Sequence, residues 1–471
     1  MKDWNRLFIR HGFMVEEKSL RVFDCIGETE KNMDFLLEGL EKLSIQYSYE
    51  NDTLTINDEP ISEDRWIKCL DFKFRGRGEG LWFRPGQEEP KIRELDTYIA
   101  GVIRQLNRLG LHTNICCDGH EKTRPSIGFA EWVEMDKVSR VFQAIGIGRF
   151  FIRNRYIRFN IERKDLLDLA EKLKAIQKDW LMEEIDFIKK QLFLQKLDTC
   201  LSIKGESGSE EGIREYVMDT IKPFVDYITE DRYGNILAET SYGTGQGPTI
   251  LLNSHLDTVD IFEDGRVIFK EDGTWSSSNG ILGADDRAGV AVLLELAERL
   301  QTIRFNGKVK WIFTVEEEIG LNGARNVDEY FLWGTDAAIV VDRRGNGDIV
   351  TSCGGYFSFC DERYGEFIEE VARNNGMDDW KCTTGGSSDT RIWASHGIQS
   401  VNLSVGYQNE HTSAETLDTD ACYQTVKLIE GIFQSTRELN NVLRTIQRRG
   451  NTVFRGRILG TSQGWKKKHE A

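Results

Sequence analysis

The sequence predicts an α/β protein, with a three-layer αβα domain built on a mostly parallel mixed sheet and preceded by an α+β domain. Two observations predict this fold class. After residue 195, short apolar runs alternate with amphipathic stretches, a pattern typical of strands covered by helices. The chain has 471 residues, enough for more than one domain at about 100–200 residues each.

Residues 1–190 are expected to form the α+β domain, and their sequence does not indicate a role. A helical stretch at 92–109 leads into an apolar run at 111–117, and 149–161 has the pattern of a hairpin. Leucine, isoleucine and tryptophan recur at helical spacing over residues 164–195, which predicts that the domain ends in one long helix from about Lys164.

Residues 191–445 carry the alternating pattern, and 446–471 form a basic tail that we expect to be solvated or to contact the acidic domain of a neighbouring chain. The formal net charge is −16 for the chain and −21 for residues 196–443, which argues against a nucleic-acid surface there and suits a site for cations.

The expected elements are a helix from the cap at Ser207 to about Ile228, a turn at 231–235, strands at 249–253, 308–315, 337–342 and 400–405, and helices at 286–301, 362–374 and 417–443.

Acidic residues and histidines follow the predicted strands of this domain. Ligand sites of parallel sheets lie at the carboxyl ends of the strands, so these side chains should meet. Taken singly, each has an ordinary explanation, such as a helix cap for an aspartate or a solvated face for three glutamates. Their conjunction favours a site for two divalent ions, zinc first and cobalt or manganese as alternatives, because the set offers oxygen and nitrogen but no sulfur. The groups are His255 with Asp257, Asp285 with Asp286, Glu316–Glu318, Asp342 and His411.

Five motifs occur in a recognisable order: His-x-Asp, Gly-Ala-Asp-Asp-x-Ala-Gly, Glu-Glu-x-Gly, Val-Asp and a late histidine. Over about residues 192–445 the chain resembles the di-zinc exopeptidases, a clan that includes peptidase T, glutamate carboxypeptidase and the tetrahedral aminopeptidases. The resemblance implies that Asp285 bridges two ions. It also implies that His255 and Asp342 complete one metal site and that Glu318 and His411 complete the other.

The same resemblance implies a mechanism. Glu317 would be the general base, Asp257 would orient His255, and a metal-bridging hydroxide would attack the substrate carbonyl. We therefore expect a metal-dependent exopeptidase for short peptides and favour an aminopeptidase. The alternatives are a deacylase that hydrolyses N-acyl amino acids or other small amides, and an inactive binding module.

Relatives insert a further domain between these motifs, but this chain leaves little room for one. Only 30 positions separate His255 from Asp285, and 69 separate Asp342 from His411. A domain needs at least about 50 residues, and the second interval already carries predicted sheet elements. We expect a catalytic domain without an inserted lid, so that residues 1–190 would limit access or form a homo-oligomer.

Nine cysteines without framework spacing predict free thiols in the cytoplasm. The N-terminus lacks a signal-like pattern, and no apolar run reaches the roughly 18 residues that span a bilayer, so no membrane partner is expected.

Two features of the N-terminal region remain open. The segment Cys116–His120 could be a metal or redox site, but it lacks a second ligand pair, which favours a turn with buried cysteines. Arginines alternate with aromatic residues at 72–77 and 149–159. Strands with one solvent-exposed face explain this pattern best. The alternatives are a surface that binds single-stranded nucleic acid and a site for an anionic ligand.

Overall fold

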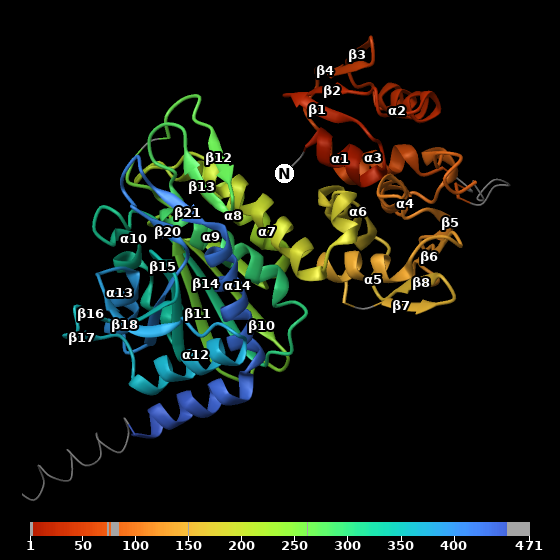
Figure 1. Ribbon diagram of the computed structural model, residues 1–471. Helices are drawn as coiled ribbons and strands as arrows, with labels where there is room; N and C mark the ends of the chain where they lie inside the picture. Colours follow the sequence, from red (N-terminus) through yellow and green to blue (C-terminus); the bar gives the residue numbers. More distant parts are fainter. Residues whose placement is uncertain (1–2, 73–74, 77–83, 149, 261, 450–471) are drawn as a thin grey trace, which may run out of the picture. The chain divides into compact units, whose positions relative to one another are not determined.

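The computed structural model divides into two compact units, Met1–Leu192 and Phe193–Ala471 (Figure 1). None of the helices in the described residues is long and apolar enough to cross a membrane. Most of the expected basic tail lies outside these residues, as does much of the arginine-rich run at 72–77. The structure describes residues 3–72, 75–76, 84–148, 150–260 and 262–449.

The N-terminal unit is α+β, as predicted, and contains two four-stranded antiparallel sheets, ordered β1-β2-β4-β3 and β5-β6-β8-β7. The expected hairpin at 149–161 is the pair β7–β8. Its elements are α1 (Trp4–His11), β1 (Glu16–Ser19), β2 (Val22–Asp24), α2 (Glu30–Lys42), β3 (Tyr47–Glu50), β4 (Thr53–Ile56), α3 (Glu63–Leu70), η1 (Ile92–Glu94), α4 (Ala100–Arg108), β5 (Thr113–Cys117), β6 (Ser126–Phe129), α5 (Met135–Ala144), β7 (Phe150–Arg153), β8 (Tyr156–Phe159) and α6 (Asp165–Ala175).

The long helix expected from Lys164 is wrong. The chain instead forms α6, a short 3-10 helix η2 (Asp179–Met182) and α7 (Ile185–Ser202), which crosses the boundary between the units. At Ile176 the backbone turns extended, with ψ of 137°. Ile176 and Trp180 are both buried on either side of this break, so the apolar spacing of a helix persists although the helix itself stops.

Two other expected helices are shorter than predicted. The stretch at 92–109 splits into η1 and α4. The helix expected to reach Ile228 ends at Ile221, because Pro223 follows and residues Tyr227–Glu230 pair with a neighbouring strand instead.

The C-terminal unit contains a nine-stranded mixed sheet, with strands ordered β17-β16-β19-β15-β11-β14-β10-β9 and β18 beside β16. Its four central strands, β19, β15, β11 and β14, are parallel, and antiparallel pairs flank them. The elements are α8 (Glu211–Ile221), η3 (Lys222–Phe224), β9 (Tyr227–Glu230), β10 (Ile236–Tyr242), β11 (Thr249–His255), β12 (Ile268–Glu271), β13 (Thr274–Ser277), α9 (Ala284–Arg299), β14 (Gly307–Thr314), α10 (Asn322–Asn326), α11 (Glu329–Leu332), β15 (Ala337–Arg343), β16 (Asp348–Cys353), β17 (Phe357–Ser358), α12 (Glu362–Asn374), β18 (Lys381–Gly385), α13 (Asp389–Ser395), β19 (Gln399–Ser404), β20 (Tyr407–Gln408), β21 (Thr416–Asp418) and α14 (Thr419–Gln434).

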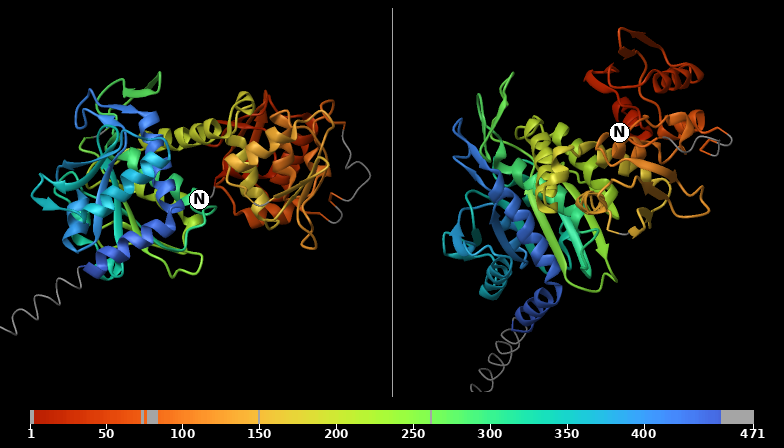
Figure 2. Two further views of the ribbon diagram at one scale, coloured as in Figure 1. Left: turned by 60° about the horizontal axis from the view of Figure 1, so that its bottom comes forward. Right: turned by 45° about the vertical axis from the view of Figure 1, so that its right-hand side comes forward.

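Helices cover both faces of this sheet, which confirms the predicted three-layer α/β fold (Figure 2). The strands are buried on both sides, so alternate residues of one strand enter different cores. Leu252 of β11 packs in the core beneath α8, α9, α12 and α14, whereas its neighbour Leu251 packs in the core beneath α10 and α13. In the described residues between His255 and Asp285, the strands are those of the hairpin β12–β13, which belongs with β21 and β20 to a small separate sheet.

Helix α9 packs tightly against the sheet at Gly289, and this contact leads to a first prediction. A Cβ at this position would lie 2.1 Å from the backbone oxygen of Val341 and 2.4 Å from Asp286 Oδ1. We expect Gly289→Ala to lower the free energy of unfolding by about 1–3 kcal/mol through overpacking. This loss corresponds to a fall of about 2–12 °C in the unfolding midpoint, measured by calorimetry on the full chain.

The matched control is Gly212→Ala in α8. There the added methyl would meet Ile203 Cγ2 at 3.5 Å and Lys204 O at 3.7 Å, which is ordinary contact. Its midpoint should stay the same or rise, since alanine favours helix. Equal midpoints for the two variants would contradict the proposed close packing.

Candidate metal centre and catalytic site

The predicted site residues gather where the central parallel strands end. His255 is the last residue of β11 and is paired with Thr314, the last residue of β14. Glu317 and Glu318 follow β14 directly, and Asp342 lies near the end of the adjacent strand β15. A parallel sheet brings these ends to one edge, so three separate parts of the sequence deliver their polar groups to the same place.

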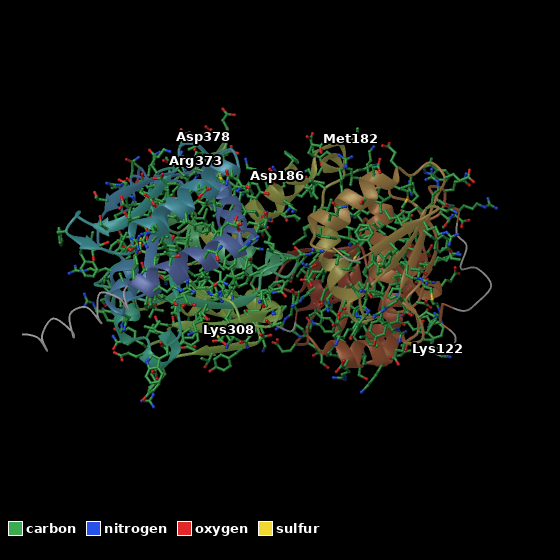
Figure 3. The ribbon with its side chains drawn as sticks, turned by 90° about the horizontal axis from the view of Figure 1, so that it is seen from below. Lys122, Met182, Asp186, Lys308, Arg373 and Asp378 are labelled. Carbon is green, nitrogen blue, oxygen red and sulfur yellow. The ribbon has the colours of Figure 1, made fainter. Side chains whose placement is uncertain are left out.

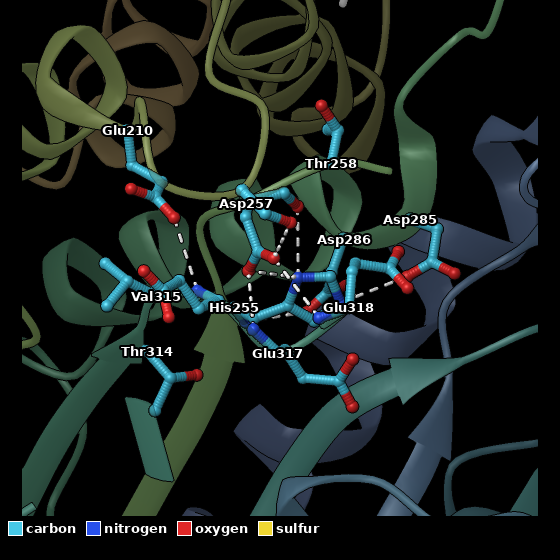
Figure 4. Close-up of polar contacts among 12 residues, drawn as sticks. Glu210, His255, Asp257, Thr258, Asp285, Asp286, Thr314, Val315, Glu317 and Glu318 are labelled. Carbon is cyan, nitrogen blue, oxygen red and sulfur yellow. Dashed lines mark hydrogen bonds and ion pairs between the residues drawn. The ribbon is translucent and has the colours of Figure 1, made fainter. Parts of the chain in front are cut away.

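Asp285 lies between two imidazoles. Its Oδ1 is 3.2 Å from His255 Nε2 (Figure 4). Its Oδ2 is 3.1 Å from His411 Nε2. Asp285 is the second residue of α9 and has non-helical backbone angles, and His411 comes from the loop between β20 and β21. The two oxygens of one carboxylate therefore face two different histidines, which is the arrangement that a bridging ligand requires.

Asp342 and Glu318 extend the cluster on either side of Asp285. Asp342 Oδ1 lies 3.6 Å from His255 Nε2, and Glu318 Oε1 lies 2.9 Å from His411 Nε2. All five residues predicted as metal ligands are thus in one continuous cluster, divided into a His255 side and a His411 side.

Asp257 contacts the second ring nitrogen of His255. Its Oδ1 lies 3.3 Å from His255 Nδ1, the ring nitrogen that faces away from Asp285. Asp257 is itself fixed by three donors: Ser207 Oγ at 2.7 Å and the backbone N–H groups of Glu317 and Glu318 at 3.0 and 3.2 Å. A carboxylate in this position fixes the orientation and tautomer of a metal-binding imidazole.

The cluster is crowded with negative charge. Burial, together with the neighbouring carboxylates of Asp342, Asp389 and Glu318, raises the pKa of Glu317 to about 10. Burial and the charges of Asp285 and Asp342 raise the pKa of Glu318 to about 8. Such repulsion is relieved when cations bind among the carboxylates.

The donor set and its spacing fit divalent ions. Tetrahedral zinc, with bonds of about 2.0–2.2 Å to nitrogen and oxygen, separates neighbouring ligand atoms by roughly 3.3–3.5 Å. The nitrogen–oxygen distances around Asp285, His255, His411, Glu318 and Asp342 run from 2.9 to 3.6 Å, close to that spacing. Two imidazoles and three carboxylates, without sulfur, suit zinc, cobalt or manganese.

Glu317 is next to these groups but is placed differently. In the described part of the chain, its carboxylate forms no hydrogen bond or ion pair, whereas its backbone N–H is held by Asp257. Figure 4 shows the Glu317 side chain directed away from the contacts that link His255 and Asp285. A buried carboxylate next to the ligands, but outside their contacts, is suited to accepting a proton.

The neighbour of Asp285 has a structural task. Asp286 Oδ2 accepts hydrogen bonds from Ser254 Oγ at 2.6 Å and from the backbone N–H of His255 at 3.2 Å, and Oδ1 accepts one from Gly289 N at 3.1 Å. These bonds fasten the start of α9 to the end of β11 and leave Asp285 as the acid that faces the histidines.

Several supporting residues were not assigned a role from the sequence. Glu415 accepts the backbone N–H groups of Gly283 and Asp285 at 2.7 and 3.0 Å and so positions Asp285. Tyr407 donates its hydroxyl proton to Asp342 Oδ1 at 3.0 Å. Glu415 lies in the same short motif as His411, but its partners are about 130 positions away, so local sequence could not reveal the contact.

Asp389 is a further buried acid beside the site. Thr314 Oγ1 donates to its Oδ2 at 2.5 Å, and burial raises the pKa of its carboxyl to about 7. Asp389 is the first residue of α13, and the side chain of the preceding Ser388 caps this helix.

Comparison with known proteins gives one family match. Residues 281–428 match the model of the M42 glutamyl aminopeptidase family. The chain is 24% identical over 317 residues to a protein of Acetivibrio thermocellus named "Putative aminopeptidase", covering 48% of this chain and 94% of that protein. It is 40% identical over 109 residues to the uncharacterized protein YqjE of Bacillus subtilis, covering 21% of this chain and 27% of that protein.

Solved structures also align with about half of the chain. Aminopeptidase PepT from Bacillus cereus shares 20% identity, with a TM-score of 0.48, over 53% of this chain and 99% of its own. The TET1 peptidase of Pyrococcus horikoshii shares 21% identity, with a TM-score of 0.44, over 52% and 99%. The family match confirms the predicted resemblance to the di-zinc exopeptidases and the predicted enzyme class, a metallopeptidase-type hydrolase.

Proposed function

We propose that the C-terminal unit is a two-metal exopeptidase that acts as an aminopeptidase on short peptides. The observation that carries the proposal is the position of Asp285, whose two oxygens face His255 and His411. In the proposed arrangement His255 and Asp342 hold one ion, Glu318 and His411 hold the other, and Asp285 is shared by both. The match to an aminopeptidase family supports this assignment.

In the proposed reaction, the metal ions and the residues of this chain have separate roles. Two divalent ions would supply Lewis acidity, which polarises the scissile carbonyl and lowers the pKa of a bound water. Glu317 accepts the proton from the attacking water and passes it to the departing amine. Asp257 keeps the His255 ring in place throughout, because three donors on other segments hold its own carboxylate.

The charge of the site favours an aminopeptidase over a deacylase. A peptide N-terminus is a cation, and Asp389 is a buried acid beside the site that serves neither as a proposed ligand nor as the base, so its carboxylate can receive this cation. An N-acyl amino acid presents a carboxylate and no ammonium group, so it gains no such contact.

A substrate panel tests this choice. We expect the full chain, loaded with zinc, cobalt or manganese, to hydrolyse aminoacyl amides with kcat/KM at least about 100-fold above that for the matched N-acyl amino acids. A preference for the N-acyl series would identify a deacylase instead. Fewer than one bound ion per chain, together with no hydrolysis, would indicate an inactive binding module.

We also propose that the protein works in the cytoplasm and that residues 1–192 mediate a homo-oligomer. All nine cysteines carry free thiols, which supports a reducing compartment. Among its described residues, the C-terminal unit has no inserted domain that could serve as an interface. Light scattering on the full chain tests the assembly, and the mass of a single chain would contradict it.

A further inference from the structure

A second cluster of metal-ligand side chains lies in the N-terminal unit, far along the sequence from the catalytic residues. It consists of Asp96, Cys117 and His120, whose ligand atoms all lie within 4.8 Å of one another. Cys117 is the last residue of β5, His120 is in the turn that follows, and Asp96 precedes α4. The third ligand absent from the local motif is thus supplied by a segment about twenty residues away.

The turn after β5 is built to bring His120 back toward Cys117. Gly119 has φ of +86°, and a Cβ there would lie 2.0 Å from the backbone oxygen of Thr123, so no other residue fits. His120 itself has φ of 47°. The next residues reach the outer surface of the unit, where Figure 3 shows the side chain of Lys122. Such a constrained turn fixes the imidazole beside the thiol.

The distance between the Asp96 and His120 ligand atoms fits one tetrahedral ion, and the Cys117 thiol lies within 4.8 Å of both. Asp96 Oδ2 lies 3.4 Å from His120 Nε2. Bonds of about 2.0–2.3 Å from zinc to oxygen, nitrogen and sulfur place neighbouring ligands roughly 3.3–3.6 Å apart. The Asp96 and Cys117 ligand atoms are also held in place: Asp118 N donates to Asp96 Oδ2 at 3.1 Å, and Gly119 N donates to Cys117 Sγ at 3.4 Å.

A second observation points to a cation here. Asp118 Oδ1 lies 3.5 Å from His120 Nδ1, the ring nitrogen that faces away from Asp96, and Arg163 Nε donates to Asp118 Oδ2 at 2.7 Å. This repeats the support that Asp257 gives to His255, where a buried carboxylate orients a metal-binding ring. The Asp96 side chain is only 2% exposed, and its Oδ1 has no hydrogen-bond partner among the described residues. A buried carboxylate left short of partners is stabilised by a bound cation.

We propose that Asp96, Cys117 and His120 bind a divalent transition-metal ion, zinc by its ligand preference, in a site separate from the catalytic centre. A mixed set of carboxylate, thiolate and imidazole suits zinc and excludes magnesium or calcium, which take oxygen ligands. Three protein ligands leave a fourth position for water or a small ligand. The His120 side chain is 23% exposed, so this position opens to solvent.

Cobalt distinguishes this site from the catalytic one, because the catalytic ligands include no sulfur. The probe is Co²⁺ added to the reduced, metal-free full chain. We expect a thiolate-to-cobalt charge-transfer band in the near ultraviolet, and we expect three bound ions per chain rather than two. The band should be absent in Cys117→Ser, which should still bind the two catalytic ions and hydrolyse peptide amides.

The matched control is Cys116→Ser, because Cys116 is the adjacent thiol on β5 and is not part of the cluster. It should keep the band. A second variant, His120→Gln, retains the thiol. It should raise the cobalt concentration that gives half of the maximal charge-transfer absorbance by at least about tenfold. Cobalt binding without a charge-transfer band in the parent protein, or a band that persists in Cys117→Ser, would overturn the proposal.

Discussion

Glu317→Gln is expected to lower kcat by about 10²–10⁴-fold while both catalytic ions stay bound. Glutamine has the size of glutamate but cannot accept a proton at neutral pH, so the variant removes the base and little else. The backbone N–H of residue 317, which donates to Asp257, is unchanged by the substitution. The measurements are kcat on an aminoacyl amide and the metal content of the dialysed protein.

The adjacent residue provides a matched control. Glu318 Oε1 lies 2.9 Å from His411 Nε2 and is expected to be a metal ligand. Glu318→Gln should therefore weaken the binding of one of the two ions. Its activity should recover as the metal concentration is raised, whereas that of Glu317→Gln should not. If Glu317→Gln hydrolyses the substrate at the parental rate, another group must be the base.

The sequence predicts that the candidate site residues lie close together, because they follow parallel strands. His255 follows β11, Glu317 and Glu318 follow β14, and Asp342 lies at the end of β15, so their convergence is a consequence of the sheet. The α/β fold class was predictable for the same reason, since buried parallel strands produce continuous apolar runs.

Other features depend on contacts that no local pattern contains. The break after Ile176 interrupts a helix without proline or glycine, and the buried residues on both sides keep helical spacing. The pairing of Asp96 with the Cys116–His120 turn joins segments that have no common motif. For this reason the sequence alone predicts a turn with buried cysteines at this position and does not predict a metal site.

The two proposed metal sites have the same arrangement of side chains around a histidine ring, although they lie in different units. In each, one imidazole nitrogen faces a carboxylate ligand and the other faces a buried aspartate that further donors hold. The candidate catalytic cluster has no sulfur ligand, and it includes Glu317, whose carboxylate has no partner among the described residues and could act as a base. The N-terminal cluster has a thiol and no such base, which suits structural or ligand-controlled binding better than hydrolysis.

Asp285→Ala is expected to abolish binding of both catalytic ions, because it removes the one carboxylate that faces both histidines. Without it, His255 and His411 belong to separate, incomplete ligand sets. In the parent protein each ion should add about 2.7 kcal/mol to stability at a free-metal concentration of about 100 Kd. The metal-dependent rise of the unfolding midpoint should therefore disappear in the variant, together with hydrolysis.

The control is Asp342→Ala, which removes a ligand from the His255 side alone. It should keep the ion held by Glu318 and His411 and retain part of the metal-dependent rise. Metal analysis and calorimetry on the two variants separate these outcomes, and the cobalt–thiolate band of the N-terminal unit should persist in both. If Asp285→Ala retains both catalytic ions, or loses only as much metal as Asp342→Ala, Asp285 does not bridge them, and the two-metal assignment would have to be replaced by two independent sites.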